Sequence, residues 1–122
     1  MAKISHFREL RVWQRGMELV VEVYRVSANF PQRETYSLTS QIRRAAVSVP
    51  SNIAEGHTRE STKEYLNHLS IAQASLAEVE AQLEIAKRLE YLRPEPTEVL
   101  LKRAVELGKQ VYALRDALNR RK

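Results

Sequence analysis

The spacing of apolar residues along the 122-residue chain predicts four helices and no strand of useful length. Apolar side chains recur three and four residues apart, which places them on one face of a helix. Turn residues separate these stretches, as at Asn29-Phe30-Pro31. The first two helices are expected at residues 10–27 and 36–55. The third begins after Ser61 and ends near residue 89, and the fourth follows residues 94–97 and ends near residue 119.

The third and fourth helices carry the most regular apolar pattern. Their apolar residues alternate four and three positions apart, which is typical of helices that pack lengthwise against each other. The connections are short, and short connections favour neighbouring helices that run in opposite directions. We therefore predict an all-α, antiparallel up-down four-helix bundle. Residues 1–122 form one domain, with an N-terminal arm at 1–9 and a basic tail at 120–122.

Residues 41–56, with the sequence QIRRAAVSVPSNIAEG, form the most distinctive segment. Pro50 lies inside an otherwise helical pattern, where it removes a hydrogen bond and costs about 3 kcal/mol. We expect a kink there, and we expect Gly56 to follow the end of the helix as its C′ residue. The residues of this segment that we assign to packing or assembly are Arg43, Arg44, Pro50, Asn52, Glu55 and Gly56.

A polar stripe follows the same helix through Arg44, Ser48, Ser51 or Asn52, and Glu55. Buried polar groups need hydrogen-bond or charge partners. The stripe is therefore interpreted as a network that fixes helix packing or subunit register. A ligand-binding groove is the alternative.

The apolar side chains of the first helix cover more than half of its circumference, which is wider than one bundle face needs. The third helix has a further apolar stripe through Ile71, Ile85 and Leu89. Large exposed apolar surfaces usually mark contacts with partners. We therefore expect a homo-oligomer. The alternative is that loops or the N-terminal arm cover these surfaces.

Two enzymatic alternatives are weaker. His57, Glu60, Glu64 and His68 lie close in sequence, but their spacing does not match the Glu-x-x-His pairs of bundle di-metal sites. Ser48 and Ser51 flank Pro50 but have no histidine within local reach in sequence, and glycine is too sparse for a phosphate-binding loop. We expect no catalytic residue, no metal site and no cofactor.

Charge is unevenly placed along the chain. The formal net charge is +5, with +3 in residues 1–60, −3 in residues 61–101 and +5 in residues 102–122. Basic ends of this kind either bind nucleic acid through phosphate contacts or meet the acidic middle of a neighbouring subunit. The candidate nucleic-acid-binding residues are Arg8, Arg11, Arg15, Arg120, Arg121 and Lys122. No recognition motif accompanies them, so binding to RNA or DNA would be weakly sequence-specific.

The composition limits the cellular setting. The chain has no cysteine, which excludes disulfides and agrees with a reducing compartment. No apolar run approaches the roughly 20 residues that span a bilayer, and the N-terminus lacks the apolar region of a secretory signal. We expect a cytoplasmic protein with no membrane partner.

Residues 36–56, together with Phe7–Leu10, Val12–Gln14 and Phe30-Pro31, resemble the bacterial four-helix bundle family that includes proteins encoded by intervening sequences within 23S ribosomal RNA genes. Further matching positions in the third helix are Tyr65, Leu69, Ile71-Ala72, Ser75-Leu76 and Glu78. The resemblance spans about residues 7–92.

The resemblance implies a homopentamer with a central channel and no catalytic residue. A more distant relative, the accessory variability protein of diversity-generating retroelements, binds nucleic acid and a reverse transcriptase through a basic pentameric surface. Together with the residues, this favours a non-enzymatic ring that binds nucleic acid through basic surfaces. The alternatives are a protein-interaction scaffold with no nucleic-acid role and, remotely, a bundle metalloenzyme.

Overall fold

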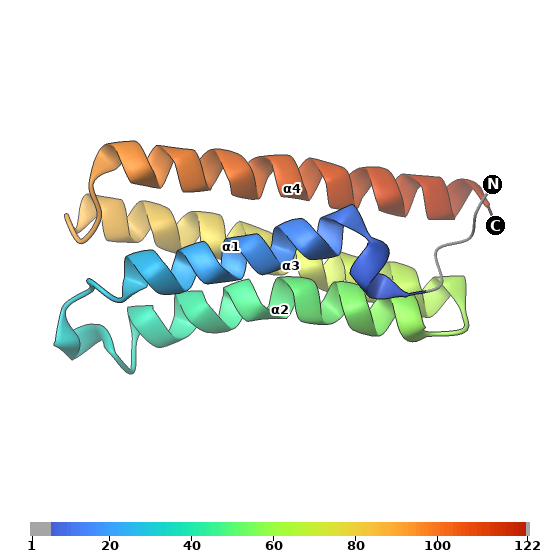
Figure 1. The fold of residues 1–122 in the computed structure, drawn as a ribbon, viewed down its shortest axis with the longest axis horizontal. Coiled ribbons are helices and arrows are strands. Elements are labelled where there is room, and N and C mark those ends of the chain that lie inside the picture. Colours follow the sequence, from blue (N-terminus) through green and yellow to red (C-terminus); the bar gives the residue numbers. More distant parts are fainter. Residues whose placement is uncertain (1–5, 122) are drawn as a thin grey trace.

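The computed structural model describes residues 6–121, which fold into four long α-helices with two short 3-10 helices and no strand. The α-helices are α1 (Arg11–Ser27), α2 (Leu38–Thr58), α3 (Thr62–Arg88) and α4 (Pro94–Arg120). The 3-10 helices η1 (Phe7–Glu9) and η2 (Gln32–Glu34) precede α1 and α2. The helices lie side by side along the long axis of the molecule, and their connections alternate between its two ends (Figure 1).

The helix boundaries agree with the apolar pattern within a few residues, with one correction in α2. Gly56 does not follow the helix as a C′ residue, because α2 continues to Thr58 and Gly56 is buried within it. At the start of α3 the Ser61 hydroxyl accepts a hydrogen bond from the Glu64 amide at 3.1 Å and so caps the helix. The prolines that precede the expected fourth helix instead form its first turn, where a missing N–H costs no helical hydrogen bond.

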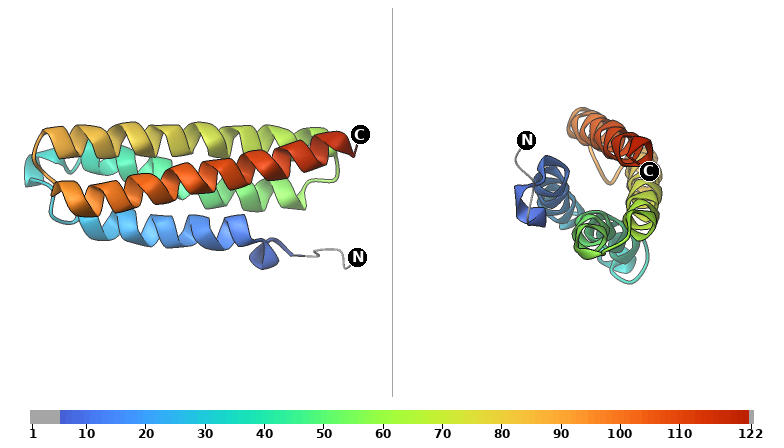
Figure 2. Two further views of the ribbon diagram at one scale, coloured as in Figure 1. Left: turned by 90° about the horizontal axis from the view of Figure 1, so that it is seen from above. Right: turned by 90° about the vertical axis from the view of Figure 1, so that its right-hand side faces the viewer.

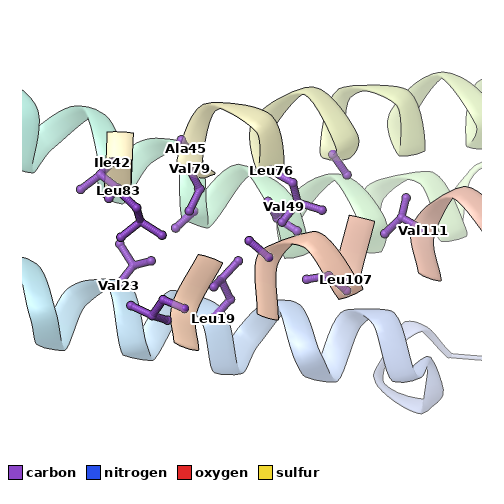
Figure 3. Packing of buried hydrophobic residues seen from close by; sticks show 14 of the residues in the cluster. Leu19, Val23, Ile42, Ala45, Val49, Leu76, Val79, Leu83, Leu107 and Val111 are labelled. Carbon is purple, nitrogen blue, oxygen red and sulfur yellow. The ribbon is translucent and has the colours of Figure 1, made fainter. Parts of the chain in front are cut away.

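The core consists of one apolar layer between the four helices. Side chains from every helix converge on it, including Val23 of α1, Val49 of α2, Leu76 of α3 and Val111 of α4 (Figure 3). The apolar residues of α3 and α4 that alternate four and three positions apart form a seam, which is buried except at the partly exposed Tyr65 and Leu114. Each fully buried Leu, Ile or Val side chain contributes about 1.5–3 kcal/mol relative to an exposed one.

Pro50 lies inside α2, which is helical on both sides of it, and is buried against α1. A Cβ atom built on Gly16 would lie 3.4 Å from the Pro50 Cβ atom, so the proline ring packs directly on the α1 backbone. This contact supplies a packing reason for a proline at this position. A Cβ atom at this distance makes an ordinary van der Waals contact, so alanine at position 16 would also fit against the proline ring.

The bundle is not equally tight around its circumference. Contacts between α2 and α3 are the most extensive, and those between α1 and α4 are the least extensive of the four neighbouring pairs. Seen along the axis, α1 and α4 stand farther apart than the other neighbours (Figure 2). A cleft of about 330 Å³ lies between them, lined by Arg15, Glu18, Leu19, Arg103, Glu106 and Leu107.

Candidate functional site

A connected set of polar side chains lies between α2 and α3. The Asn52 amide nitrogen donates to the Ser48 carbonyl at 2.9 Å and to the Ser48 hydroxyl at 3.0 Å. The Ser75 hydroxyl donates to the Ser48 hydroxyl oxygen at 2.8 Å. The Asn52 Oδ1 atom lies 2.9 Å from His68 Nδ1, and Glu55 Oε2 lies 3.6 Å from that nitrogen. We call Ser48, Asn52, Glu55, His68 and Ser75 the α2–α3 polar network.

The geometry of this network limits its chemistry. Because the Asn52 amide nitrogen faces Ser48, its oxygen accepts from His68, and neutral His68 therefore carries its proton on Nδ1. The Asn52 side chain thus separates the imidazole from the Ser48 hydroxyl. An amide neither takes nor gives a proton at neutral pH, so His68 has no direct route to activate Ser48. The network is suited to fixing the register of α2 on α3.

Gly56 extends the same contact toward the end of α2. A Cβ atom at this position would lie 2.8 Å from the His68 Cβ atom and 2.9 Å from Tyr65 Cδ1. Glycine therefore allows α2 and α3 to approach closely beside the network. Burial of the neighbouring Tyr65 raises the pKa of its hydroxyl to about 12.

The two arginines of the α2 motif have different surroundings. Arg43 donates to the Ser27 hydroxyl at 2.8 Å and to the Tyr24 carbonyl at 3.2 Å, and its guanidinium lies 4.5 Å from the centre of the Tyr24 ring. It therefore joins α2 to the last turn of α1. Arg44 is exposed and takes part in none of the hydrogen bonds or ion pairs among residues 6–121.

The structure changes the membership of the predicted stripe. Ser48, Asn52 and Glu55 belong to the network, whereas Arg44 and Ser51 point to solvent. The sequence pattern places His68 only among possible metal ligands and does not include Ser75 in the stripe. His68 and Ser75 are seven residues apart, and buried Gln82 follows seven residues after Ser75. This spacing beside the apolar residues of α3 is a signal that identifies the polar edge of the α2–α3 contact.

His57, Glu60, Glu64 and His68 lie close in sequence but are not arranged as a metal site. Within residues 6–121 no group of three or more His, Asp or Glu side chains is placed to hold a metal ion. His57 instead packs edge-on against the Tyr65 ring, with 5.9 Å between ring centres. No helix in the described part of the chain is long and apolar enough to cross a membrane.

Two exposed apolar surfaces occupy the outer sides of α1 and α3. Met17, Val21 and Tyr24 are 41%, 51% and 43% exposed, although each is a large apolar or aromatic side chain. With the half-buried Trp13 and Val20 they form a surface that we call the α1 face. The residues that we call the α3 face are Ile71, Ala74, Glu78, Ala81, Ile85 and Leu89, all of them exposed.

The candidate nucleic-acid residues are distributed over both terminal segments. Arg8 lies in η1, and Arg11 and Arg15 lie in the first turns of α1, where Arg15 also lines the cleft. Arg120 ends α4 and pairs with Asp116 at 2.9 Å, and Arg121 follows it as the cap residue. Lys122 lies outside the described residues. The start of α1 and the end of α4 lie toward the same end of the molecule (Figures 1 and 2).

The fold and these surfaces define an all-α, four-helix protein with a polar network between two helices and unpartnered apolar faces outside. The chain belongs to the 23S rRNA-intervening sequence protein family, whose family model matches residues 8–113.

A solved structure supports this assignment. A protein of unknown function from the S23 ribosomal protein family of Bacteroides thetaiotaomicron superimposes with a TM-score of 0.76 and is 26% identical. The match covers 84% of this chain and 96% of the other. No curated protein matches the chain. Neither similarity names an enzymatic activity.

Proposed function

We propose that this chain is a non-enzymatic assembly protein: an antiparallel bundle, bent at Pro50, that associates with copies of itself into a ring. The observation that carries the proposal is the α1 face, where Met17, Val21 and Tyr24 remain 41–51% exposed. Contiguous apolar side chains on a folded surface favour association. Burying them contributes a favourable free energy of about 25 cal/mol for each Å² of apolar area removed from water. The family resemblance makes a pentamer the expected ring.

Light scattering coupled to size-exclusion chromatography tests this assembly. One chain has a mass of 14.1 kDa, so a pentamer has a mass of about 70 kDa. A species several times the single-chain mass at micromolar concentration supports the proposal. A 14.1 kDa species under the same conditions contradicts it.

Nucleic-acid binding is the second candidate function. The observation that favours it is the succession of Arg8 in η1 and Arg11 and Arg15 in the first turns of α1, in a chain of net charge +5. None of the ion pairs among residues 6–121 neutralises these three guanidinium groups. Repetition of these arginines around a ring would produce an extended positive surface for a phosphate backbone. Binding through this surface would depend little on base sequence.

A mobility-shift series over salt concentration, with RNA and with DNA, tests this second function. Log affinity decreases with log salt concentration, and the magnitude of this slope decreases by roughly 0.7–0.9 for each phosphate contact that is lost. A variant with Gln at positions 8, 11 and 15 should therefore bind more weakly and with a shallower slope. The matched control replaces Arg44, Arg59 and Arg93, which are exposed elsewhere. Absence of binding to either nucleic acid at low salt would leave a protein-interaction scaffold as the function.

A further inference from the structure

The α3 face differs in shape from the α1 face. Ile71, Ile85 and Leu89 are 42%, 47% and 51% exposed and lie toward its two ends. The small side chains of Ala74 and Ala81 lie between them, on either side of Glu78, so that the face continues at three- and four-residue spacing along the helix. The α1 face, in contrast, carries large side chains throughout. Helices pack well when large residues of one oppose small residues of the other. The shapes of the two faces are thus complementary.

Their charges are complementary as well. Between residues 71 and 84, α3 carries three glutamates and no lysine or arginine. Lys87 and Arg88 pair with Glu84, whereas Glu78 and Glu80 take part in none of the ion pairs among residues 6–121. The first turns of α1 carry Arg11 and Arg15. Their guanidinium groups also take part in none of the ion pairs among residues 6–121. The basic α1 start and the acidic middle of α3 therefore attract each other.

The outer surface of α4 lacks this complementarity. Val99, Val105 and Tyr112 are exposed on it. However, the stretch from residue 99 to residue 115 carries Lys102, Arg103, Lys109 and Arg115 against a single acidic residue, Glu106. Like charges would oppose contact between α4 and the basic start of α1. Charge thus distinguishes α3 from α4 as the partner of the α1 face.

We propose that the α1 face of one copy of this chain packs against the α3 face of the next copy. The inference rests on the proposed self-assembly and specifies which surfaces meet. Because two different faces form the contact, every subunit has one of each to offer. Such head-to-tail contacts repeat from subunit to subunit and close into a ring when the rotation permits. A contact of a face with itself would instead stop at a dimer.

Two variants separate the faces. The first, Met17→Asp with Val21→Asp, disables the α1 face and places negative charge against the acidic α3. The second, Ile71→Lys with Ile85→Lys, disables the α3 face and places positive charge against the basic α1 start. All four replaced side chains are 41–51% exposed, so the fold should be retained, which circular dichroism checks. A third variant, Tyr112→Asp, alters the more exposed α4 surface as a control.

Light scattering on each variant and on their mixture gives the result. Each face variant alone should have the mass of one chain, 14.1 kDa. An equimolar mixture should yield a species of two chains, about 28 kDa, because each variant still offers the face that the other lacks. It extends further only if the Asp-bearing α1 face and the Lys-bearing α3 face, whose introduced charges are opposite, pair with each other. The Tyr112→Asp variant should keep the wild-type mass.

Other outcomes overturn the proposal in distinguishable ways. If wild-type protein is itself monomeric, the proposed assembly fails and this pairing fails with it. If wild type assembles but the α3-face variant keeps the wild-type mass, assembly stands and the pairing of α1 with α3 is wrong. If both face variants are monomeric and the mixture gives no two-chain species, the head-to-tail arrangement is wrong. Dissociation of the Tyr112→Asp variant would place α4 in the contact and overturn the assignment of α3.

Discussion

Two glycines inside long helices have different roles at the residue scale. A Cβ atom at Gly56 would lie 2.8 Å from a side-chain atom of His68, closer than real Cβ atoms approach their neighbours. At Gly108 the nearest atom to such a Cβ is 4.0 Å away, on Leu76. Glycine is therefore required for packing at position 56 and is only a weak helix former at position 108.

Replacement of each glycine by alanine should shift stability in opposite directions. We expect Gly56→Ala to lower the free energy of unfolding by about 1–3 kcal/mol, because α2 and α3 must separate to accept the methyl group. Gly108→Ala should raise it by up to about 1 kcal/mol through helix propensity. Urea denaturation at one protein concentration measures both. Equal effects of the two changes would contradict the packing role of Gly56.

Asn52 is the central member of the α2–α3 polar network. Asn52→Ala removes the contacts with both Ser48 oxygens and with His68 and leaves partly buried polar groups without partners. We expect a loss of about 1–3 kcal/mol in the free energy of unfolding. The exposed neighbour gives the control, since Ser51→Ala should change stability by less than about 0.5 kcal/mol. A stable Asn52→Ala protein would show that the network contributes nothing net to the fold.

At the scale of elements, single side chains join helices that are distant in sequence. Arg43 connects α2 to the C-terminal turn of α1 through Ser27 and Tyr24. At the same end of the molecule, the Tyr91 hydroxyl donates to Glu34 at 2.8 Å and links the α3–α4 connection to the α1–α2 connection. The rings of Phe30 and Tyr91 pack beside this bond, with 5.7 Å between their centres.

Loss of the Arg43 connection should loosen the end of α1. In Arg43→Ala we expect faster hydrogen exchange at the Ala28 and Phe30 amides, which bond the Tyr24 and Ser27 carbonyls. The change should correspond to about 1 kcal/mol of lost protection. Arg44→Ala, one residue further, should leave these amides unchanged. Similar exchange in both variants would mean that Arg43 does not hold the turn.

The Glu34–Tyr91 contact should make stability depend on pH. Hydrogen bonds from the Tyr91 hydroxyl and then the Leu38 amide lower the pKa of Glu34 from 4.5. A carboxylate whose pKa is lower in the folded state stabilises the fold above its unfolded pKa and loses this effect as the pH falls through its folded pKa. Tyr91→Phe should therefore melt below wild type at neutral pH, with the difference shrinking in acid below pH 4.5. Thermal melts over this range test it, and a constant difference would contradict it.

Local patterns predicted the elements better than the contacts between them. Three- and four-residue spacing predicts the buried faces of α3 and α4, because burial repeats with the helical turn, whereas the apolar arc of α1 is wider than its buried face. The same reasoning misread Gly56, since a glycine near a helix end serves equally as a C′ residue or as a close-packing position. Likewise, Arg43 and Arg44 are chemically identical, and only the rotation of α2 against α1 separates the bound residue from the free one. His68 entered the network through the packing of α3 on α2.

At the scale of the whole molecule, assembly and stability should be linked. Association that requires the folded chain stabilises it by mass action, so the melting temperature should rise with protein concentration. The variant Met17→Asp with Val21→Asp, which disables the α1 face, should melt at a temperature independent of concentration. Calorimetry over a hundredfold range of about 1–100 μM measures both. A concentration-independent melt of wild type would indicate that the folded monomer needs no partner.

The sparse contact between α1 and α4 has a kinetic consequence. Contacts between helices adjacent in sequence, such as α2 and α3, close short loops and form early, whereas the α1–α4 contact must join the two ends of the chain. We expect the α1–α4 contact to form last during folding and to open first under native conditions. Substitutions along the α1–α4 cleft should then accelerate unfolding and leave the folding rate nearly unchanged. The seam that closes the bundle would set how long a folded molecule survives.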